Sequence, residues 1–132
     1  MALVLDFPED LPKDITQIIW GRPDQRARVT ARLFINELKK KGGVMTRHAV
    51  SDFASGLNRG EFIWHNGKFR YSRKNFYAIV LSRLIRIECV AYEANYHKGK
   101  LVEGYWLDLG GFLKKLRRVG ERWKAEFPLS SS

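Results

Sequence analysis

Apolar side chains recur at intervals of three and four residues in four stretches of the chain. This spacing places them on one face of an α-helix. The stretches predict helices over about 24–41, 47–57, 73–86 and 111–126. Thr46 and Ser72 stand directly before two of these helices, where a hydroxyl side chain can cap the first turn. Gly42-Gly43 and Pro128 mark two of the helix ends.

Strand-like segments fill the gaps between the predicted helices. Val44-Met45 predicts a short strand. Asn66-Gly67 lies between two aromatic-rich segments and predicts a small hairpin over 61–71, because both central residues of a type I′ turn need positive φ. Alternating apolar residues predict a second hairpin over 87–107, with a basic turn at His97-Lys98-Gly99-Lys100.

The two ends of the chain differ from the middle. Pro8 and Pro12 interrupt a short apolar segment, and Lys13–Trp20 could form two helical turns. An apolar arm of this length packs either on its own domain or on a partner subunit. We therefore expect an N-terminal arm and short helix over 1–22, one domain over 23–127 and a flexible tail over 128–132.

Composition narrows the class of protein. The 132 residues fit one domain, and the 45% hydrophobic content is enough for a core, which excludes disorder for most of the chain. A single cysteine excludes an internal disulfide framework. No apolar run is long enough to cross a bilayer, and no secretory signal precedes the domain, so we expect a cytoplasmic, nucleoid-associated protein. The net charge of +10 favours a nucleic acid as the partner.

The order of predicted elements resembles a winged helix-turn-helix, as in MarR-like and PadR-like transcriptional regulators. The resemblance covers about residues 24–127, and four segments carry most of it: Phe76–Leu84, Ile87–Val90, His97–Lys100 and Gly104–Leu107. It implies an α+β fold, mainly helical, with an extra hairpin between the second and third helices and a C-terminal helix. The chain departs from the pattern at 58–71, where the family has a short turn, and at Arg86-Ile87, where it usually has a glycine.

The resemblance also implies which residues contact DNA. Helix 73–86 would read the major groove, and the wing at 87–107 would reach the backbone or minor groove. Arginine suits guanine and asparagine suits adenine, while the start of the helix at 47 suits a phosphate. The candidate DNA-binding residues are Arg47, Arg70, Ser72, Arg73, Lys74, Asn75, Tyr77, His97, Lys98 and Lys100. Each has a simpler reading as a helix cap, a solvated charge or, for Tyr77, a core residue.

Two further interpretations stay open. Aromatic and basic residues alternate in the inserted hairpin, where Trp64, Phe69 and Tyr71 could stack on the bases of RNA or single-stranded DNA. They could equally form cross-strand pairs and a small core.

A winged helix can also serve as a protein-interaction module. For the DNA reading, the resemblance implies a homodimer built by the C-terminal helix and the N-terminal arm, facing half-sites about one DNA turn apart.

Catalytic signals are weak, so we expect no enzyme, no metal and no cofactor. The three histidines, His48, His65 and His97, fall in separate elements without metal-ligand spacing. Cys89 lies in an apolar segment, where a lone cysteine is usually a small core residue. Acidic residues concentrate only at the second hairpin, as Glu88, Glu93, Glu103 and Asp108.

Overall fold

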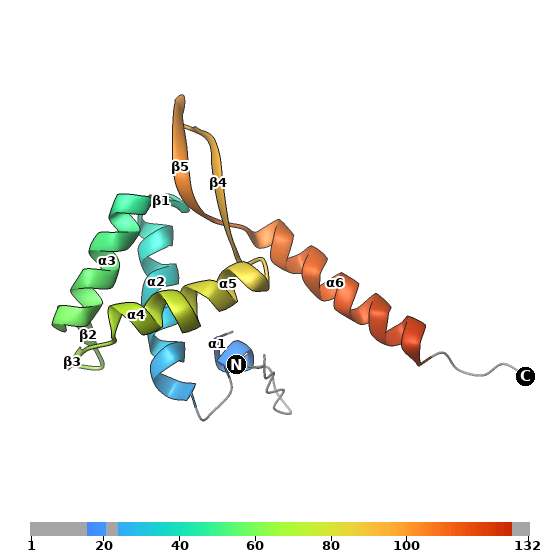
Figure 1. The fold of residues 1–132 in the computed structure, drawn as a ribbon, viewed down its shortest axis with the longest axis horizontal. Helices are drawn as coiled ribbons and strands as arrows, with labels where there is room; N and C mark the ends of the chain where they lie inside the picture. The colour runs from blue at the N-terminus through green and yellow to red at the C-terminus, as the bar shows by residue number, and fades with distance from the viewer. Residues whose placement is uncertain (1–15, 21–23, 128–132) are drawn as a thin grey trace, which may run out of the picture.

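A helical body carries a hairpin and a long helix that project from it in different directions (Figure 1). The computed structural model describes residues 16–20 and 24–127. Most of the predicted N-terminal arm, at 1–15 and 21–23, and the predicted tail at 128–132 lie outside the described residues. The end of the predicted short helix is present as α1 (Thr16–Trp20).

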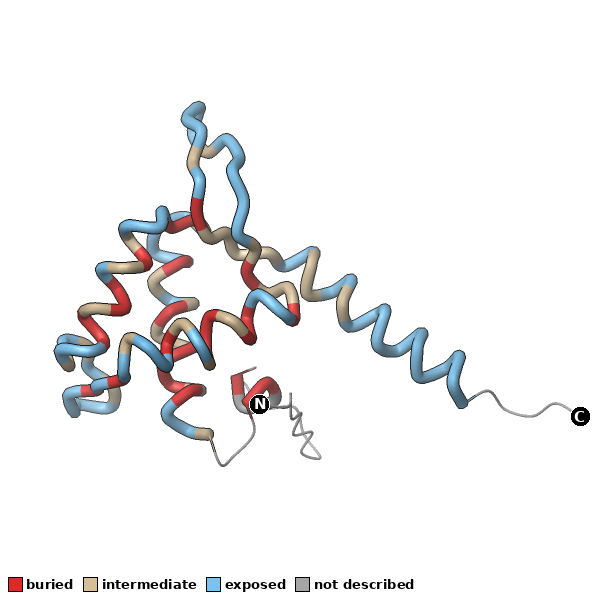
Figure 2. The backbone as a smooth tube through the Cα atoms, viewed as in Figure 1, coloured by how far each residue is buried: buried red, intermediate tan, exposed pale blue. Residues whose placement is uncertain are grey.

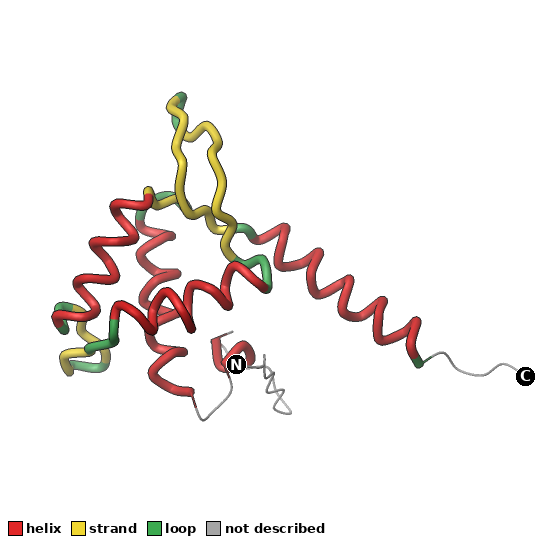
Figure 3. The backbone as a smooth tube through the Cα atoms, in the orientation of Figure 1, coloured by secondary structure: helices red, strands yellow, loops and turns green. Residues whose placement is uncertain are grey.

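The described chain mixes helices and strands, as the α+β prediction requires (Figure 3). The elements after α1 are α2 (Gln25–Lys40), β1 (Val44–Thr46), α3 (Arg47–Arg59), β2 (Phe62–Trp64), β3 (Gly67–Phe69), α4 (Arg73–Asn75), η2 (Phe76–Leu81), α5 (Ser82–Arg86), β4 (Val90–His97), β5 (Lys100–Leu107) and α6 (Leu109–Glu126). The segments α4, η2 and α5 form one continuous helix with a π-helical middle, over the range that the periodicity predicts. The predicted extra hairpin is present as β2–β3.

Side-chain caps fix where two of the helices begin. The Thr46 hydroxyl accepts a hydrogen bond from the Ala49 N–H at 3.1 Å, and the Ser72 hydroxyl accepts one from the Asn75 N–H at 3.0 Å. Each bond satisfies one of the backbone donors that a helix start leaves unpaired. Gly60, with φ +73°, ends α3 in the left-handed region that glycine adopts without strain.

The core lies where α2, α3 and the α4–η2–α5 helix face one another (Figure 2). Phe34 of α2, Phe53 of α3 and Phe76 of η2 form a cluster with ring centroids 5.2–5.4 Å apart. Phe34 and Phe76 are fully buried. Leu38 and Leu84 extend the same core. The apolar stripes read from the sequence therefore converge on one another.

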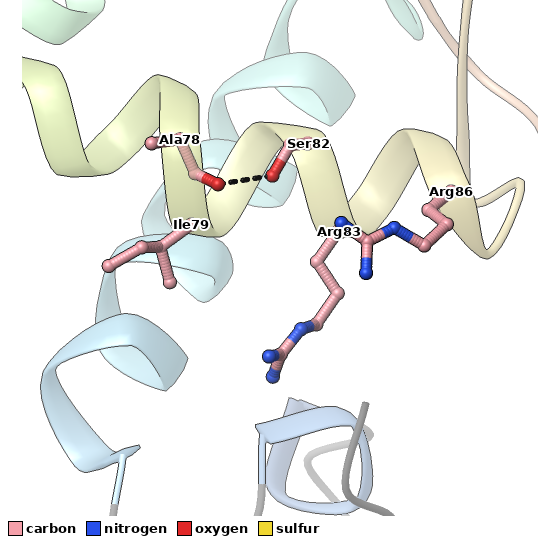
Figure 4. A pocket seen from close by; sticks show the side chains of 5 residues that line it. All are labelled: Ala78, Ile79, Ser82, Arg83 and Arg86. Carbon is pink, nitrogen blue, oxygen red and sulfur yellow. Dashed lines mark hydrogen bonds between the residues drawn. The ribbon is translucent and has the colours of Figure 1, made fainter. Parts of the chain in front are cut away.

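A buried arginine fastens α1 to this body. Arg83 is only 4% exposed, and its Nη1 donates to the Ile19 carbonyl oxygen at 3.4 Å. Its guanidinium also lies over the Trp20 ring, 5.4 Å from the centroid. Figure 4 shows Arg83 turned toward α1, while the Ser82 hydroxyl donates to the Ala78 carbonyl within the helix. Arg83 thus lies on the buried face of its helix, beside Leu84, because its guanidinium contacts α1.

A three-stranded antiparallel sheet of order β1–β5–β4 joins the hairpin to the body. The predicted strand at Val44-Met45 is confirmed, and Thr46 pairs with Gly104 of β5. A Cβ built on Gly104 would overlap the Met45 carbonyl oxygen and lie 2.9 Å from the Thr46 Cα. Only glycine lets β1 approach β5 this closely.

Two predicted boundaries in the strands are wrong. The turn of the first hairpin is His65-Asn66, with φ of 50° and 66°, rather than Asn66-Gly67. This register pairs Phe62 with Phe69, so that both rings can face the body. The second hairpin begins at Val90 rather than 87, because the chain turns first at Glu88, where φ is 65°.

Gly104→Ala should lower the free energy of unfolding by about 1–3 kcal/mol, because the new methyl group forces β1 away from β5. Chemical denaturation measures the change. Gly67→Ala is the matched control, since a Cβ there meets only the Trp64 carbonyl oxygen at an ordinary 3.7 Å. Equal stability of the two variants would contradict the close approach at Gly104.

Candidate nucleic-acid interface

Three elements that are distant in sequence line one hollow of about 480 Å³. The start of α3, the first turns of the α4–η2–α5 helix and the middle of β5 contribute to it. The lining residues are Arg47, His48, Ser51, Arg73, Tyr77 and Tyr105. Three of these, Arg47, Arg73 and Tyr77, are predicted DNA-binding residues, so the fold brings together part of the predicted set.

Arg47 supplies the exposed positive charge of this hollow. It is the first residue of α3, where unpaired backbone N–H groups already attract an anion. Its charge also acts on two tyrosines of the hairpin. Desolvation raises the pKa of Tyr105 and a hydrogen bond to Glu103 raises that of Tyr92, and Arg47 opposes both shifts. The start of α3 therefore lies close enough to the base of the β4–β5 hairpin for the Arg47 charge to act on its tyrosines.

The Arg73 guanidinium forms hydrogen bonds within the protein. Its Nη1 donates to the Ser51 carbonyl at 2.8 Å and to the Ser55 hydroxyl at 2.9 Å, and its Nη2 donates to the Ser51 hydroxyl at 2.9 Å. Its guanidinium lies over the Tyr77 ring, 5.3 Å from the centroid. The predicted guanine contact is therefore not the arrangement seen, because the side chain holds α4 against α3.

The other candidates at this helix start divide into two groups. Lys74 and Asn75 are exposed in the first turn of α4. Ser72 acts as the N-cap, and Tyr77 is half-buried with its ring packed edge-on against Phe76 at 5.3 Å. Only Lys74 and Asn75 thus offer uncommitted polar groups outward from this turn.

Arg70 lies outside the hollow. It is exposed beside Gly60 at the opposite end of α3, and its backbone carbonyl accepts a hydrogen bond from Arg26. Arg70 is therefore not among the predicted residues that the fold brings together at the hollow.

The candidates in the basic turn also separate. Lys98 and Lys100 are exposed at the end of a hairpin that stands away from the body (Figure 1). His97 instead packs edge-on against the Trp106 ring, with centroids 5.8 Å apart, and lies beside Gly42. The two lysines are thus presented outward, whereas the His97 ring packs within the protein.

Sequence reasoning missed three residues of the hollow: His48, Ser51 and Tyr105. Ser51 lies four residues after Arg47 and therefore shares its helix face, a signal that the pattern contains. Tyr105 comes from a distant strand, and only the β1–β5 pairing brings it to α3. His48 is exposed and lies 3.4 Å from the Asp52 carboxylate.

The inserted hairpin uses its aromatic residues internally. Phe69 and Tyr71 are each 8% exposed, and the guanidinium of Arg26 covers the Phe69 ring at 5.0 Å. Phe62 packs on Phe53 of the core at 4.8 Å. Trp64 is half-buried. This arrangement matches the cross-strand and core reading of these residues.

Cys89 is partly shielded from solvent, and three acidic residues at the second hairpin form contacts within the protein. Burial raises the pKa of the Cys89 thiol to about 12, so the thiol stays protonated at neutral pH. Glu88 pairs with Arg118, Glu103 accepts from the Tyr92 hydroxyl, and Asp108 caps α6. Within residues 16–20 and 24–127, no group of three or more His, Cys, Asp or Glu side chains lies close enough to hold a metal ion.

Comparison with known proteins gives no relative: no protein-family model, curated protein or solved structure matches the chain. Among the helices of the described part of the chain, none combines the length and apolar character needed to cross a membrane.

Arg73→Met should lower the free energy of unfolding by about 1–3 kcal/mol, because three hydrogen bonds between α4 and α3 are lost. Lys74→Met, at the exposed neighbouring position, removes the same charge and should stay within about 0.5 kcal/mol of the wild type. Urea denaturation compares the two variants. If Lys74→Met were the more destabilised, Arg73 would not be the link between the helices.

Cys89 should react with a thiol reagent far more slowly than a free cysteine. With a pKa of about 12, roughly one thiol in ten thousand is ionised at pH 8. The reaction rate should keep rising with pH beyond pH 9, where an ordinary thiol is already ionised. Mass spectrometry follows the modification, and the urea-unfolded protein is the control that should react at the ordinary rate. Rapid labelling of the native protein at pH 7 would contradict this environment.

Proposed function

We propose that this protein binds double-stranded DNA as a winged helix-turn-helix and acts as a small dimeric transcriptional regulator. In this proposal α3 and the α4–η2–α5 helix are the helix pair, and the β4–β5 hairpin is the wing. One observation carries the proposal. The start of α3, the first turns of the next helix and the base of the hairpin converge on a single hollow that contains Arg47, His48 and Arg73.

The charge of the chain supports a polyanionic ligand. The net charge is +10, and Arg47, Lys74, Lys98 and Lys100 are exposed on the elements that border the hollow or project beside it. Binding would release counterions from the phosphates, so affinity would fall steeply with salt. The N-terminus of α3 adds its own attraction for a phosphate next to Arg47.

Sequence preference would come from the first turn of α4. Lys74 and Asn75 are exposed there, and their polar atoms suit guanine and adenine edges in the major groove. Arg73 has a positioning role in this proposal, since it fixes the angle between α4 and α3. Lys98 and Lys100 would contact the backbone beside the groove.

The competing interpretations have less support. Binding of RNA or a single strand by stacking needs exposed aromatic faces, whereas Phe69 and Tyr71 are buried and Trp64 is half-buried. The proposal assigns the protein no catalytic role, metal or cofactor. A protein-interaction role has one observation in its favour, the exposed apolar face of α6. That face is compatible with DNA binding, because a dimer would present two α4 helices to one duplex.

Selection from a random duplex pool, followed by titration at several salt concentrations, tests the proposal. Arg47→Gln should weaken binding to all duplexes about three- to tenfold and reduce the slope of log affinity against log salt by about one. Asn75→Ala should instead lower the preference for the selected sequence about tenfold, because a base contact is lost.

Lys124→Gln is the control for charge alone, since Lys124 lies exposed near the far end of α6. It should change affinity less than twofold. A preference for single strands over duplex, or an effect of Lys124→Gln equal to that of Arg47→Gln, would contradict the proposed site.

A further inference from the structure

The long helix α6 touches the rest of the protein only near its start, as far as the described contacts go. Phe112 packs against the core cluster, and Lys115 and Arg118 pair with Glu88 after α5. Beyond this point α6 extends away from the body (Figure 1), and Figure 2 shows it exposed along its length. The helix is therefore attached through Phe112 in its first turn and through the polar side that carries Arg118.

The opposite side of α6 is a continuous apolar stripe. Large hydrophobic residues follow one another at intervals of three and four and are 47–77% exposed. They are Leu109, Leu113, Leu116, Val119, Trp123 and Phe127. At 100° per residue they fall within one arc of about 120°, which contains no charged residue. Phe112, in the first turn, falls within the same arc and packs on the core, whereas the six other apolar side chains are left exposed.

The area of this stripe is large enough for a stable interface. The six exposed side chains present on the order of 700 Å² of surface, close to the roughly 800 Å² that each partner of a standard interface buries. It also exceeds the patch of about 300–600 Å² that a typical monomer exposes. An uncovered stripe of this size would make the protein prone to aggregation.

Gly120 lies within the same arc, at the middle of the exposed part of the helix. A Cβ built there meets nothing within 4 Å. Glycine in a helix interior costs about 1 kcal/mol relative to alanine, and no contact within the described protein requires it here. A glycine at this place would let the backbone of another helix approach closely.

We propose that the stripe of α6 packs against α6 of a second copy of this chain, in antiparallel orientation, with the two helices crossing at Gly120. In this arrangement Val119 meets the partner's Gly120, and Trp123 meets the partner's Leu116. Phe127 then lies beside the partner's Phe112. Small residues occupy the crossing point and the largest side chains flank it, so the stripe is complementary to its own copy.

The charges on α6 set the orientation. The first half contains Lys114, Lys115, Arg117 and Arg118 and no acidic residue. The second half is neutral, because Glu121 and Glu126 balance Arg122 and Lys124. A parallel pair would place the two basic halves together, whereas an antiparallel pair places each basic half beside a neutral one. Opposed helix dipoles favour the same orientation.

This dimer would also set the arrangement of the DNA sites, a consequence that rests on the proposed function. An 18-residue helix is about 27 Å long. Phe112 of the two copies, where each body is attached, would lie about 22 Å apart along the crossed pair, because 15 residues separate the paired positions. The two bodies would be related by a two-fold axis, so we expect the selected DNA to contain two inverted half-sites.

Sedimentation equilibrium of the full chain without DNA tests the interface independently of DNA binding. The wild type should have twice the chain mass of 15.4 kDa, and Trp123→Lys should have the mass of a monomer. Ala125→Lys is the matched control: it adds the same charge to α6 outside the stripe and should remain dimeric. A wild type that is monomeric at tens of micromolar would overturn the proposal.

Two further variants test the crossing point and the orientation. Gly120→Leu should weaken the dimer at least tenfold, although it adds apolar surface, because it separates the helices. Stronger association of this variant would mean that the stripe associates non-specifically, and it would overturn the crossing at Gly120. In a Cys89→Ser background, Gly120→Cys should form an interchain disulfide. Leu113→Cys should not, because the two copies would lie about 20 Å apart in the antiparallel pair. A disulfide at residue 113 would overturn the orientation.

These outcomes are separable from failure of the proposed function. A wild type that is dimeric but does not bind duplex DNA would overturn the DNA proposal and leave the proposed interface intact. Duplex binding by a wild-type monomer would do the reverse. Trp123→Lys should retain salt-dependent binding to DNA with lower affinity, because each copy keeps its Arg47 and Lys74.

Discussion

The contact among Phe34, Phe53 and Phe76 is the interaction on which the body of this protein depends. Each ring comes from a different helix, and the centroids lie 5.2–5.4 Å apart. Aromatic side chains contribute large buried areas with restricted geometry, so this cluster fixes both the distance and the tilt of the helices around it. The positions of Arg47 at one helix start and Lys74 at another follow from that arrangement.

Polar contacts add to the aromatic cluster in fixing the positions of the helices. Arg73 ties α4 to the serines of α3, and Arg83 ties α1 to the end of the same long helix. The β1–β5 pairing brings Tyr105 to the start of α3. The contacts of Arg73 and the β1–β5 pairing therefore position residues that line the hollow.

The helix α6 differs from α2 and α3 because most of its apolar face is exposed. Its apolar stripe resembles those of α2 and α3 in sequence, but the body holds α6 near its start, through Phe112 and through the ion pairs of Arg118 and Lys115 with Glu88. The stripe is therefore left on the outside, with Trp123 66% exposed. The protein therefore has a second exposed surface in addition to the hollow at Arg47, and the proposed dimer would link the two.

The sequence by itself determined the element order, most helix boundaries, the caps at Thr46 and Ser72 and the basic character of the surface, because these depend on local spacing and composition. Only the tertiary structure decided which side chains are available. Periodicity marks Arg73 and Lys74 as neighbours, yet Arg73 meets Ser51 and Ser55 across a helix pair, whereas Lys74 points outward. It also marks an apolar face on 111–126 without saying what covers it. Whether a residue is buried, paired or exposed depends on which distant residues pack against it. Local sequence spacing does not identify those residues.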